Sequence, residues 1–173
     1  MSVDTRDPKA AEALVAACEG SVAVESHGQS VVVLNLDHWH DAAVQLRDAF
    51  EYALAVDITA VDHLLDHDRW IPQGIVATRF EIVANFLSLT RNTRIRLIAQ
   101  IGEENPTVAS IADVFPGLHN PEREIFDLLG VHFDGHTEMT RILMPDEWIG
   151  APLRKDAPGA RIPVTFKGDG GAR

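Results

Sequence analysis

The sequence predicts an α+β fold: a mixed, largely antiparallel sheet of four to five strands with helices packed on one face, plus an extended C-terminal arm. Two observations predict the two kinds of element. In some segments apolar residues recur every three to four positions, which is the period of a helix with one buried stripe. In other segments they alternate with polar residues, which is the period of a strand with one solvated face.

The N-terminal part is expected to form a helix, a β-hairpin and a second helix. Residues 8–19 place apolar side chains at helical spacing, and Gly20 ends that pattern. Two β-branched runs then flank His27-Gly28-Gln29, and a glycine between such runs is typical of a hairpin turn. Asp37 is a candidate N-cap for the second helix. The buried stripe of that helix consists of Trp39, Ala43, Leu46 and Phe50.

Alternating segments predict three more strands, and capping signals predict two more helices. The strands cover residues 54–59, 79–86 and 94–101, because apolar side chains recur there at every second position, mostly with polar side chains between them. Residues 107–116 fit one further helix. The last helix is capped by Asn120, has Pro121 at its first position and ends at Gly130.

The last 29 residues hold four of the nine prolines and five of the twelve glycines, a composition that builds no regular element and no core of its own. We therefore expect an α+β globular domain over residues 1–144 and an extended, partner-binding arm over residues 145–173. The arm carries Trp148, Leu153 and Ile162 among cationic residues. Large apolar and arginine side chains without a local core are typical of a protein interface, so the arm is expected to lie on a partner.

Composition excludes several classes of function. The chain has 173 residues with a formal net charge of −11, which argues against binding to nucleic acid or anionic lipid. No apolar run approaches the ~20 residues of a membrane helix, so no direct membrane span is expected. The acidic N-terminus does not look like a signal sequence, which predicts a cytoplasmic start. Cys18 is the only cysteine, and one cysteine forms neither an internal disulfide nor a cysteine-ligated cluster.

Candidate catalytic and metal-binding patterns are weak. His63 and His67 stand four residues apart, but the glutamate of a zinc-hydrolase motif is missing and the surrounding run is acidic. No glycine-rich phosphate loop and no serine nucleophile motif occurs. The sequence therefore predicts no catalytic, cofactor-binding or metal-binding residue on this chain.

Three acidic residues crowd the start of the last predicted helix. Glu122, Glu124 and Asp127 complement the positive end of the helix dipole, and Arg123 and Arg141 are candidate ion-pair partners. A pair of carboxylates also serves general acid and base catalysis in many enzymes, so this alternative stays open. The structural role is favoured, because nothing else in the sequence supports a catalytic site.

Residues 122–156 hold a dense series of residues at fixed spacing: Glu122-Arg123-Glu124, Asp127, Gly130, Phe133, Gly135-His136, Arg141-Ile142-Leu143, Pro145-Asp146, Trp148, Gly150 and Pro152-Leu153-Arg154-Lys155-Asp156. In this series the chain resembles the C-type subunit of bacterial proton-pumping NADH-quinone oxidoreductase, the 30-kilodalton-type subunit family of respiratory complex I. The upstream segments Asp57–Asp62, Arg79–Val83 and Leu87–Leu89 also look like this family, and the similarity extends over about residues 54–168.

The resemblance implies a non-catalytic structural subunit in the peripheral arm of that complex, which passes electrons from NADH through FMN and iron–sulfur clusters to quinone and couples this to proton pumping. It implies that FMN and the clusters lie on partner subunits and that this chain carries no cofactor. The expected partners are the D-type subunit and neighbouring iron–sulfur subunits. The expected location is the cytoplasmic side of the cell membrane, reached through the complex.

The expected partner interface combines the motif residues with the apolar residues of the arm, so that Trp148→Ala should weaken assembly rather than change a chemical step. A related alternative is the equivalent subunit of a membrane-bound hydrogenase or of a dehydrogenase fed by ferredoxin or deazaflavin. Alternatives from other classes are a stand-alone binding module and an acid/base enzyme. The expected interface residues are Glu122, Arg123, Glu124, His136, Arg141, Trp148, Leu153, Arg154, Lys155 and Asp156.

Overall fold

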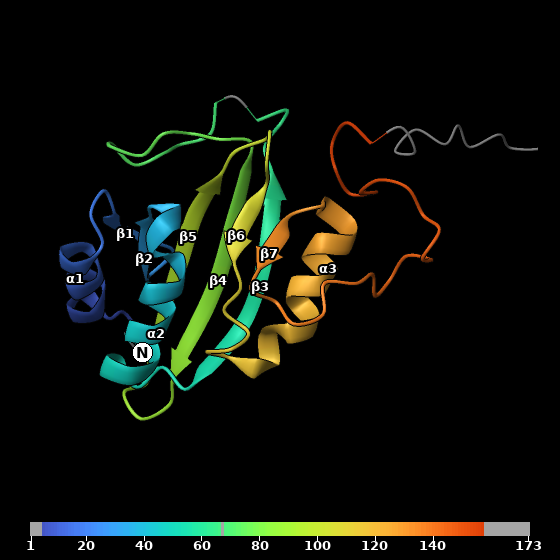
Figure 1. The fold of residues 1–173 in the computed structure, drawn as a ribbon. Helices are drawn as coiled ribbons and strands as arrows, with labels where there is room; N and C mark the ends of the chain where they lie inside the picture. The colour runs from blue at the N-terminus through green and yellow to red at the C-terminus, as the bar shows by residue number, and fades with distance from the viewer. Residues whose placement is uncertain (1–4, 67, 158–173) are drawn as a thin grey trace, which may run out of the picture.

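The computed structural model describes residues 5–66 and 68–157, and these form an α+β fold around one five-stranded sheet (Figure 1). The strand order is β1-β2-β5-β4-β3. Strands β2 and β5 run parallel and the other neighbours antiparallel, so the predicted mixed, largely antiparallel sheet is confirmed. The strands are β1 (Val22–Ser26), β2 (Gln29–Leu34), β3 (Leu54–Asp62), β4 (Phe80–Ser88) and β5 (Thr93–Ile101).

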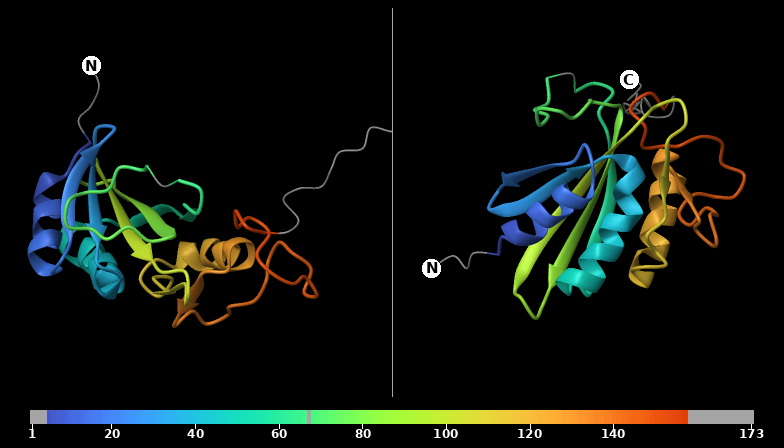
Figure 2. Two further views of the ribbon diagram at one scale, coloured as in Figure 1. Left: turned by 90° about the horizontal axis from the view of Figure 1, so that it is seen from above. Right: turned by 60° about the vertical axis from the view of Figure 1, so that its left-hand side comes forward.

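The helices of the described residues cover one face of this sheet, as predicted (Figure 2). Beside the last helix lies a small second sheet in which strands β6 and β7 pair in parallel. None of the described helices has the length and apolar character needed to cross a membrane. The remaining elements are α1 (Pro8–Ala17), 3-10 turn η1 (Leu36–His38), α2 (Trp39–Phe50), β6 (Thr107–Ala109), 3-10 turn η2 (Pro116–Leu118), α3 (His119–Leu129) and β7 (His132–Asp134).

The core forms where the alternating side chains of the sheet meet the helices. The register pairs Phe80 with Ile101 and Phe86 with Ile95, which puts the apolar positions of β4 and β5 on the same face. A slip of one residue would turn all of these side chains toward water, so burial of this face fixes the register. The helices complete the core with Leu14, Trp39, Leu46 and Ile125.

The predicted hairpin is confirmed, and its turn explains the position of the glycine. His27 and Gly28 both have positive φ angles, 52° and 70°. Two consecutive residues of this kind make the tight turn whose twist matches that of two antiparallel strands. Strands β1 and β2 therefore pair directly from Ser26 and Gln29 outward.

Two of the predicted caps are wrong, because a 3-10 turn precedes each helix. Asp37 lies inside η1, where its backbone N–H donates to the side chain of Asn35 at 3.4 Å, and α2 begins only at Trp39. Likewise α3 continues directly from η2 and begins at His119, which places Asn120 within its first turn. The helix ends at Gly130, as predicted.

The helix predicted over residues 107–116 is also wrong. Residues Thr107–Ala109 form β6, whose partner β7 enters the structure only after α3. The β-branched Thr107 and Val108 suit a strand. Local periodicity carries no information on a partner so far along the chain, and the short apolar pattern was therefore ambiguous.

Substitution of a core residue in the central strand should destabilise the whole domain. Leu97 of β5 is fully buried between the helices and the neighbouring strands. We expect Leu97→Ala to lower the free energy of unfolding by about 2 to 5 kcal/mol, through lost burial and the cavity left behind. Urea denaturation measures this change. Ile98→Ala, on the opposite and half-buried face of the same strand, serves as control, and an equal loss in both variants would contradict the assigned register.

Candidate partner-binding surface

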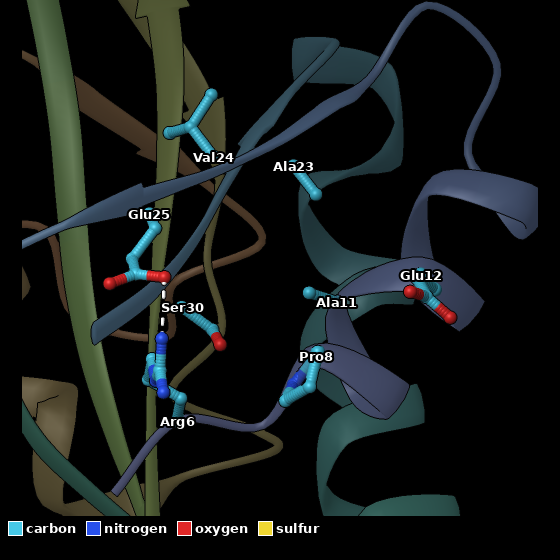
Figure 3. Close-up of a pocket in the computed structure, with 8 residues that line it drawn as sticks. All are labelled: Arg6, Pro8, Ala11, Glu12, Ala23, Val24, Glu25 and Ser30. Carbon is cyan, nitrogen blue, oxygen red and sulfur yellow. Dashed lines mark hydrogen bonds and ion pairs between the residues drawn. The ribbon is translucent and has the colours of Figure 1, made fainter. Parts of the chain in front are cut away.

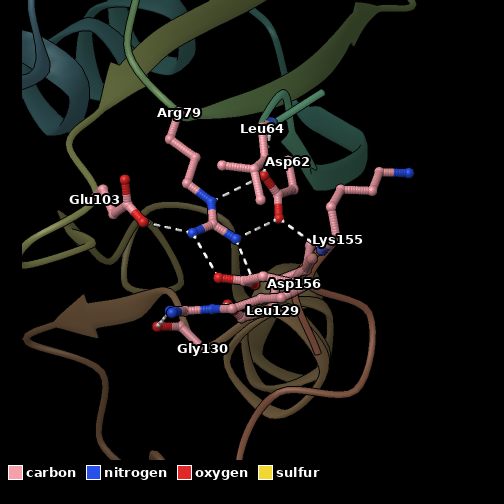
Figure 4. Close-up of polar contacts among 9 residues, drawn as sticks. Asp62, Leu64, Arg79, Glu103, Leu129, Gly130, Lys155 and Asp156 are labelled. Carbon is pink, nitrogen blue, oxygen red and sulfur yellow. Dashed lines mark hydrogen bonds and ion pairs between the residues drawn. The ribbon is translucent and has the colours of Figure 1, made fainter. Parts of the chain in front are cut away.

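Arg79, which directly precedes β4, is held between two carboxylates (Figure 4). Its Nε and Nη2 donate to both oxygens of Asp62 at 3.0 and 2.9 Å. Its Nη1 and Nη2 donate to both oxygens of Asp156 at 3.0 and 2.6 Å, and Nη1 also reaches Glu103 at 2.6 Å. Two-pronged pairs of this kind fix orientation as well as charge. Arg79 therefore links the C-terminal segment, residues 135–157 after β7, to the end of the main sheet.

Asp62, the last residue of β3, is the more deeply buried of the two carboxylates that bind Arg79 at both oxygens. Its side chain is only 1% exposed. It also accepts hydrogen bonds from the backbone N–H groups of Lys155 at 2.9 Å and Leu64 at 3.0 Å. Burial by itself raises the pKa of this carboxyl, but Arg79 and the two backbone donors outweigh burial and hold the pKa at about 2. Asp62 is therefore ionised throughout the physiological range.

Arg154 closes the C-terminal end of α3. Its Nε donates to the carbonyl of Leu129 at 2.6 Å and its Nη2 to the carbonyl of Gly130 at 3.2 Å. These carbonyls lie at the negative end of the helix, where a cation is favourable. The guanidinium also lies 5.1 Å from the centre of the Phe80 ring, and the Arg79 guanidinium lies 4.9 Å from the same ring.

Gly130 is required by the same contact. Its φ of +70° is the left-handed conformation that ends α3. A Cβ atom on this residue would lie 2.9 Å from Nη2 of Arg154. Glycine therefore serves both the helix end and the close approach of the arginine.

Asp127 of α3 makes a second set of contacts with the C-terminal segment. Its fully buried carboxylate accepts hydrogen bonds at Oδ2 from three successive backbone N–H groups at 2.7 to 3.0 Å, and at Oδ1 from Arg141 at 2.5 Å. Burial raises the pKa of Asp127, but these four donors outweigh it and lower the pKa to about 2. The three backbone donors belong to Ile142, Leu143 and Met144.

Glu122 lies in the interior, so the prediction that it contacts a partner is wrong. The residue is fully buried, and its carboxylate accepts hydrogen bonds from Ser110 Oγ at 2.5 Å and from the backbone N–H of Ile111 at 2.8 Å. Burial raises its pKa, against these donors. Glu122 thus joins α3 to the turn after β6. Glu124 is exposed, so the two carboxylates do not share a site, as the acid/base alternative would require.

Arg141, one of the two candidate ion-pair partners of the acidic residues in α3, pairs with Asp127. Arg141, Arg154 and Asp156 all bind atoms of their own chain. The expectation that the cationic side chains of this segment find their partners only on another protein is therefore wrong for Arg141 and Arg154. Residues 158–173 of the predicted arm, with Ile162, lie outside the described residues.

Of the other predicted interface residues, Arg123 and His136 bind atoms of their own chain, whereas Lys155 is exposed. Arg123 donates to Thr140 Oγ1 at 2.8 Å and to the carbonyl of Arg141 at 3.1 Å, which holds the segment against α3. His136 donates from Nε2 to the carbonyl of His119 at 3.0 Å, and its Nδ1 accepts from the N–H of Glu138. The side chain of Lys155 is exposed.

Apolar side chains remain on the outside of the C-terminal segment. Its exposed large apolar residues are Leu143, Trp148, Ile149 and Leu153, of which Ile149 is 95% exposed. A second exposed group, Leu65, Trp70 and Val76, lies on the loop between β3 and β4. Large apolar side chains that are exposed on neighbouring positions of one segment are typical of interaction surfaces. Contact of Trp148 and Leu153 with a partner stays a prediction.

A cavity of about 380 Å³ lies elsewhere, between α1 and the β1–β2 hairpin (Figure 3). An ion pair between Arg6 and Glu25 at 2.8 Å lies in its lining. Across residues 5–66 and 68–157, no three histidine, cysteine or acidic side chains are placed to hold a metal ion. His67 lies outside those ranges, so the expectation for His63 and His67 stays a prediction.

Sequence reasoning did not identify the partners of this segment on the main sheet. The sequence placed Asp62 and Arg79 only in two segments that look like the family, Asp57–Asp62 and Arg79–Val83. In the structure they meet because β3 and β4 are antiparallel neighbours. Two opposite charges at adjoining ends of two predicted strands are the signal that points to such a pair.

The contact of Arg79 with the buried Asp62 should contribute more to folding stability than its contact with the half-exposed Asp156. We expect Arg79→Met to cost about 3 kcal/mol, because it leaves the Asp62 charge buried without its main partner. Asp156→Ala should cost much less, since the Asp156 side chain is half exposed and water screens its charge. Urea denaturation of both variants gives these values, and equal losses would argue against the assigned difference in burial.

The two lowered pKa values predict a loss of stability in acid. Asp62 and Asp127 have pKa values of about 2, against an ordinary value of 3.8. Above about pH 4 both are ionised in the folded and unfolded states, and each contributes about 2 kcal/mol. As the pH falls from about 4 to 2, the unfolded chain takes up protons first and this contribution disappears. Urea unfolding across this range should show a weaker pH dependence for Asp127→Asn, and unchanged dependence would contradict the assignment.

Comparison with known proteins gives the family. Residues 32–162 match the model for the 30 Kd subunit of respiratory-chain NADH dehydrogenase. The chain is 38% identical over 141 residues, 82% of its length and 54% of the relative, to the C subunit of NADH-quinone oxidoreductase from Saccharopolyspora erythraea. It is 41% identical over 107 residues to the C/D subunit of NADH-quinone oxidoreductase from Methylococcus capsulatus, covering 62% of this chain and 18% of that relative.

The fold also matches a solved structure. A trypsin-resistant fragment of Nqo5 superposes with a TM-score of 0.65 at 23% identity, covering 76% of this chain and 97% of the fragment. The chain spans about half the length of the first curated relatives it matches. Because the family model covers most of the chain, including both sets of contacts around α3, the chain belongs to the family of the 30 Kd subunit of respiratory-chain NADH dehydrogenase.

Proposed function

We propose that this chain is a non-catalytic structural subunit in the peripheral arm of NADH-quinone oxidoreductase, the enzyme that passes electrons from NADH through FMN and iron–sulfur clusters to quinone and couples this to proton pumping. The observation that carries the proposal is the family match over residues 32–162, which includes strands β3, β4 and β5 of the main sheet, α3 and the C-terminal segment bound to it. A relative named as the C subunit of that oxidoreductase matches 82% of this chain.

The contacts around α3 support a structural role. The charged groups buried in this region hold one part of the chain to another: Asp62 and Arg79 bind residues 155–156, and Asp127 binds residues 141–144. Each of these groups is committed to several fixed partners, whereas a general acid or base must exchange its proton with a substrate. The region presents a shaped surface to a neighbour and leaves chemistry to other subunits.

We further propose that the chain carries no cofactor and that FMN and the clusters lie on its partners. Cys18 is the one cysteine of the sequence, and it is buried at the end of α1 with a pKa raised by burial and by Asp41. A single buried thiol cannot supply the four ligands of a cluster. The chain then contributes to electron transfer by holding cofactor-bearing subunits in place.

The partners we propose are the D-type subunit and neighbouring iron–sulfur subunits. The relative from Methylococcus capsulatus supports the first of these, because its name joins the C and D subunits in one protein. Through these partners we expect the chain at the cytoplasmic side of the cell membrane, as a peripheral subunit.

Affinity purification tests the proposal. A tagged copy of the full chain, expressed in its own organism and extracted from membranes with mild detergent, should co-purify with the other subunits of an NADH-oxidising, quinone-reducing complex. Deletion of the gene should abolish assembly of that complex, while the isolated chain should show no NADH oxidation. Recovery of the chain alone, or turnover by the isolated chain, would contradict the proposal.

A further inference from the structure

Residues 141–150 form a closed loop on the outside of α3, which we call the anchor loop. Arg141 closes it by donating from Nη2 to the carbonyl of Gly150 at 3.0 Å. Asp127 holds its first part through three backbone N–H groups. A turn lies at its tip, where the N–H of Trp148 donates to the carbonyl of Pro145 at 2.9 Å. The loop is therefore shaped by hydrogen bonds, without an apolar core of its own.

Three large apolar side chains of the anchor loop are exposed. Leu143 is 58% exposed, Trp148 44% and Ile149 95%. Large apolar groups on a loop whose backbone is already fixed bind a partner at low entropic cost, because little additional ordering is needed. Tryptophan is also among the residues that contribute most to binding when an interface buries them.

The exposed charges of the anchor loop are negative. Arg141, its only cationic residue, is used at the base, where it binds Asp127 and Gly150. The other charged side chains, Asp146 and Glu147, are both exposed and directly precede Trp148. The loop therefore presents apolar groups beside two negative charges. The sequence had indicated a cationic contact through Arg141, Arg154 and Lys155, and the structure turns the two arginines inward.

The negative charge of the anchor loop distinguishes among the kinds of partner that could bind it. A second copy of the chain carries the same formal net charge of −11 and would bring acidic loops toward an acidic surface. Nucleic acid and anionic lipid are repelled for the same reason. A protein surface with an apolar pocket and lysine or arginine at its rim matches both the apolar and the acidic parts of the loop.

We propose that the anchor loop inserts Trp148 and Ile149 into an apolar pocket with a positively charged rim on a neighbouring protein subunit. The proposal rests on the proposed function, because it takes the neighbour from the same complex. Asp146 and Glu147 pair with the basic rim, and Asp127 holds the loop in its binding shape before the partner arrives.

The test measures binding of the purified full chain to the remaining peripheral-arm subunits, the D-type subunit and its iron–sulfur neighbours, co-expressed and purified without this chain. Asp146→Lys/Glu147→Lys should weaken binding about ten-fold or more, and Asp146→Asn/Glu147→Gln less, because reversal adds repulsion to lost attraction. Trp148→Ala should weaken binding by a similar factor. Wild-type binding should also weaken between about 50 and 300 mM salt, and less so for the Asn/Gln variant.

The matched control is Glu12→Lys/Glu19→Lys, which changes net charge equally on exposed residues at the other end of the sheet. It should bind like the wild type. Thermal unfolding of every variant checks that the domain is folded, and the milder Asn/Gln variant serves if the Lys variant is not. Unchanged binding of the Asp146→Lys/Glu147→Lys variant, or equal weakening in the control variant, would overturn the proposal that the anchor loop binds a basic-rimmed pocket. Failure of the wild-type chain to bind the remaining subunits overturns the proposed function instead.

Discussion

The structure depends on giving partners to a few charges buried where the C-terminal segment meets the main domain. Asp62 and Asp127 lie almost wholly out of water, and an unpaired carboxylate in such a place costs several kcal/mol. Their partners come from far along the chain: Arg79, Arg141 and successive backbone N–H groups. Satisfying these two carboxylates brings the end of β3, the length of α3 and the last described residues into one fixed arrangement.

A division of roles between side chains follows from this constraint. The arginines of the C-terminal segment turn inward, because carbonyl and carboxylate oxygens of the same chain accept their hydrogen bonds along α3 and at its end. The apolar side chains have no such partners, and Trp148, Ile149 and Leu153 remain on the outside. The charged side chains thus fix the conformation of the segment, and its exposed apolar side chains are available to bind a partner. A surface that is ordered before binding loses less entropy when a partner covers it.

The same contacts give a physical reason for the spacing of the residues that carry the family resemblance. Asp127 must lie within reach of three consecutive N–H groups, Gly130 must leave room for Arg154, and Asp156 must reach Arg79. Each contact joins a side chain to atoms at one defined place in the backbone. An insertion between α3 and residue 156 would shift several contacts together, so the segment tolerates little change in length.

The sequence by itself determined the strands of the main sheet and the helices that cover one face of it, because periodic burial is a local property of the chain. The resemblance to the family rested on motif residues at fixed spacing, which are also read directly from the chain. The sequence also indicated Arg141 as one of two candidate partners for the acidic residues of α3, and the structure pairs it with Asp127. Only the tertiary structure decided that Thr107–Ala109 is a strand, that Glu122 is buried and that Arg154 turns back onto α3. Each of these depends on a partner distant in the sequence, such as β7 for Thr107–Ala109. Local spacing records which face of an element is apolar, but not which distant segment will cover it.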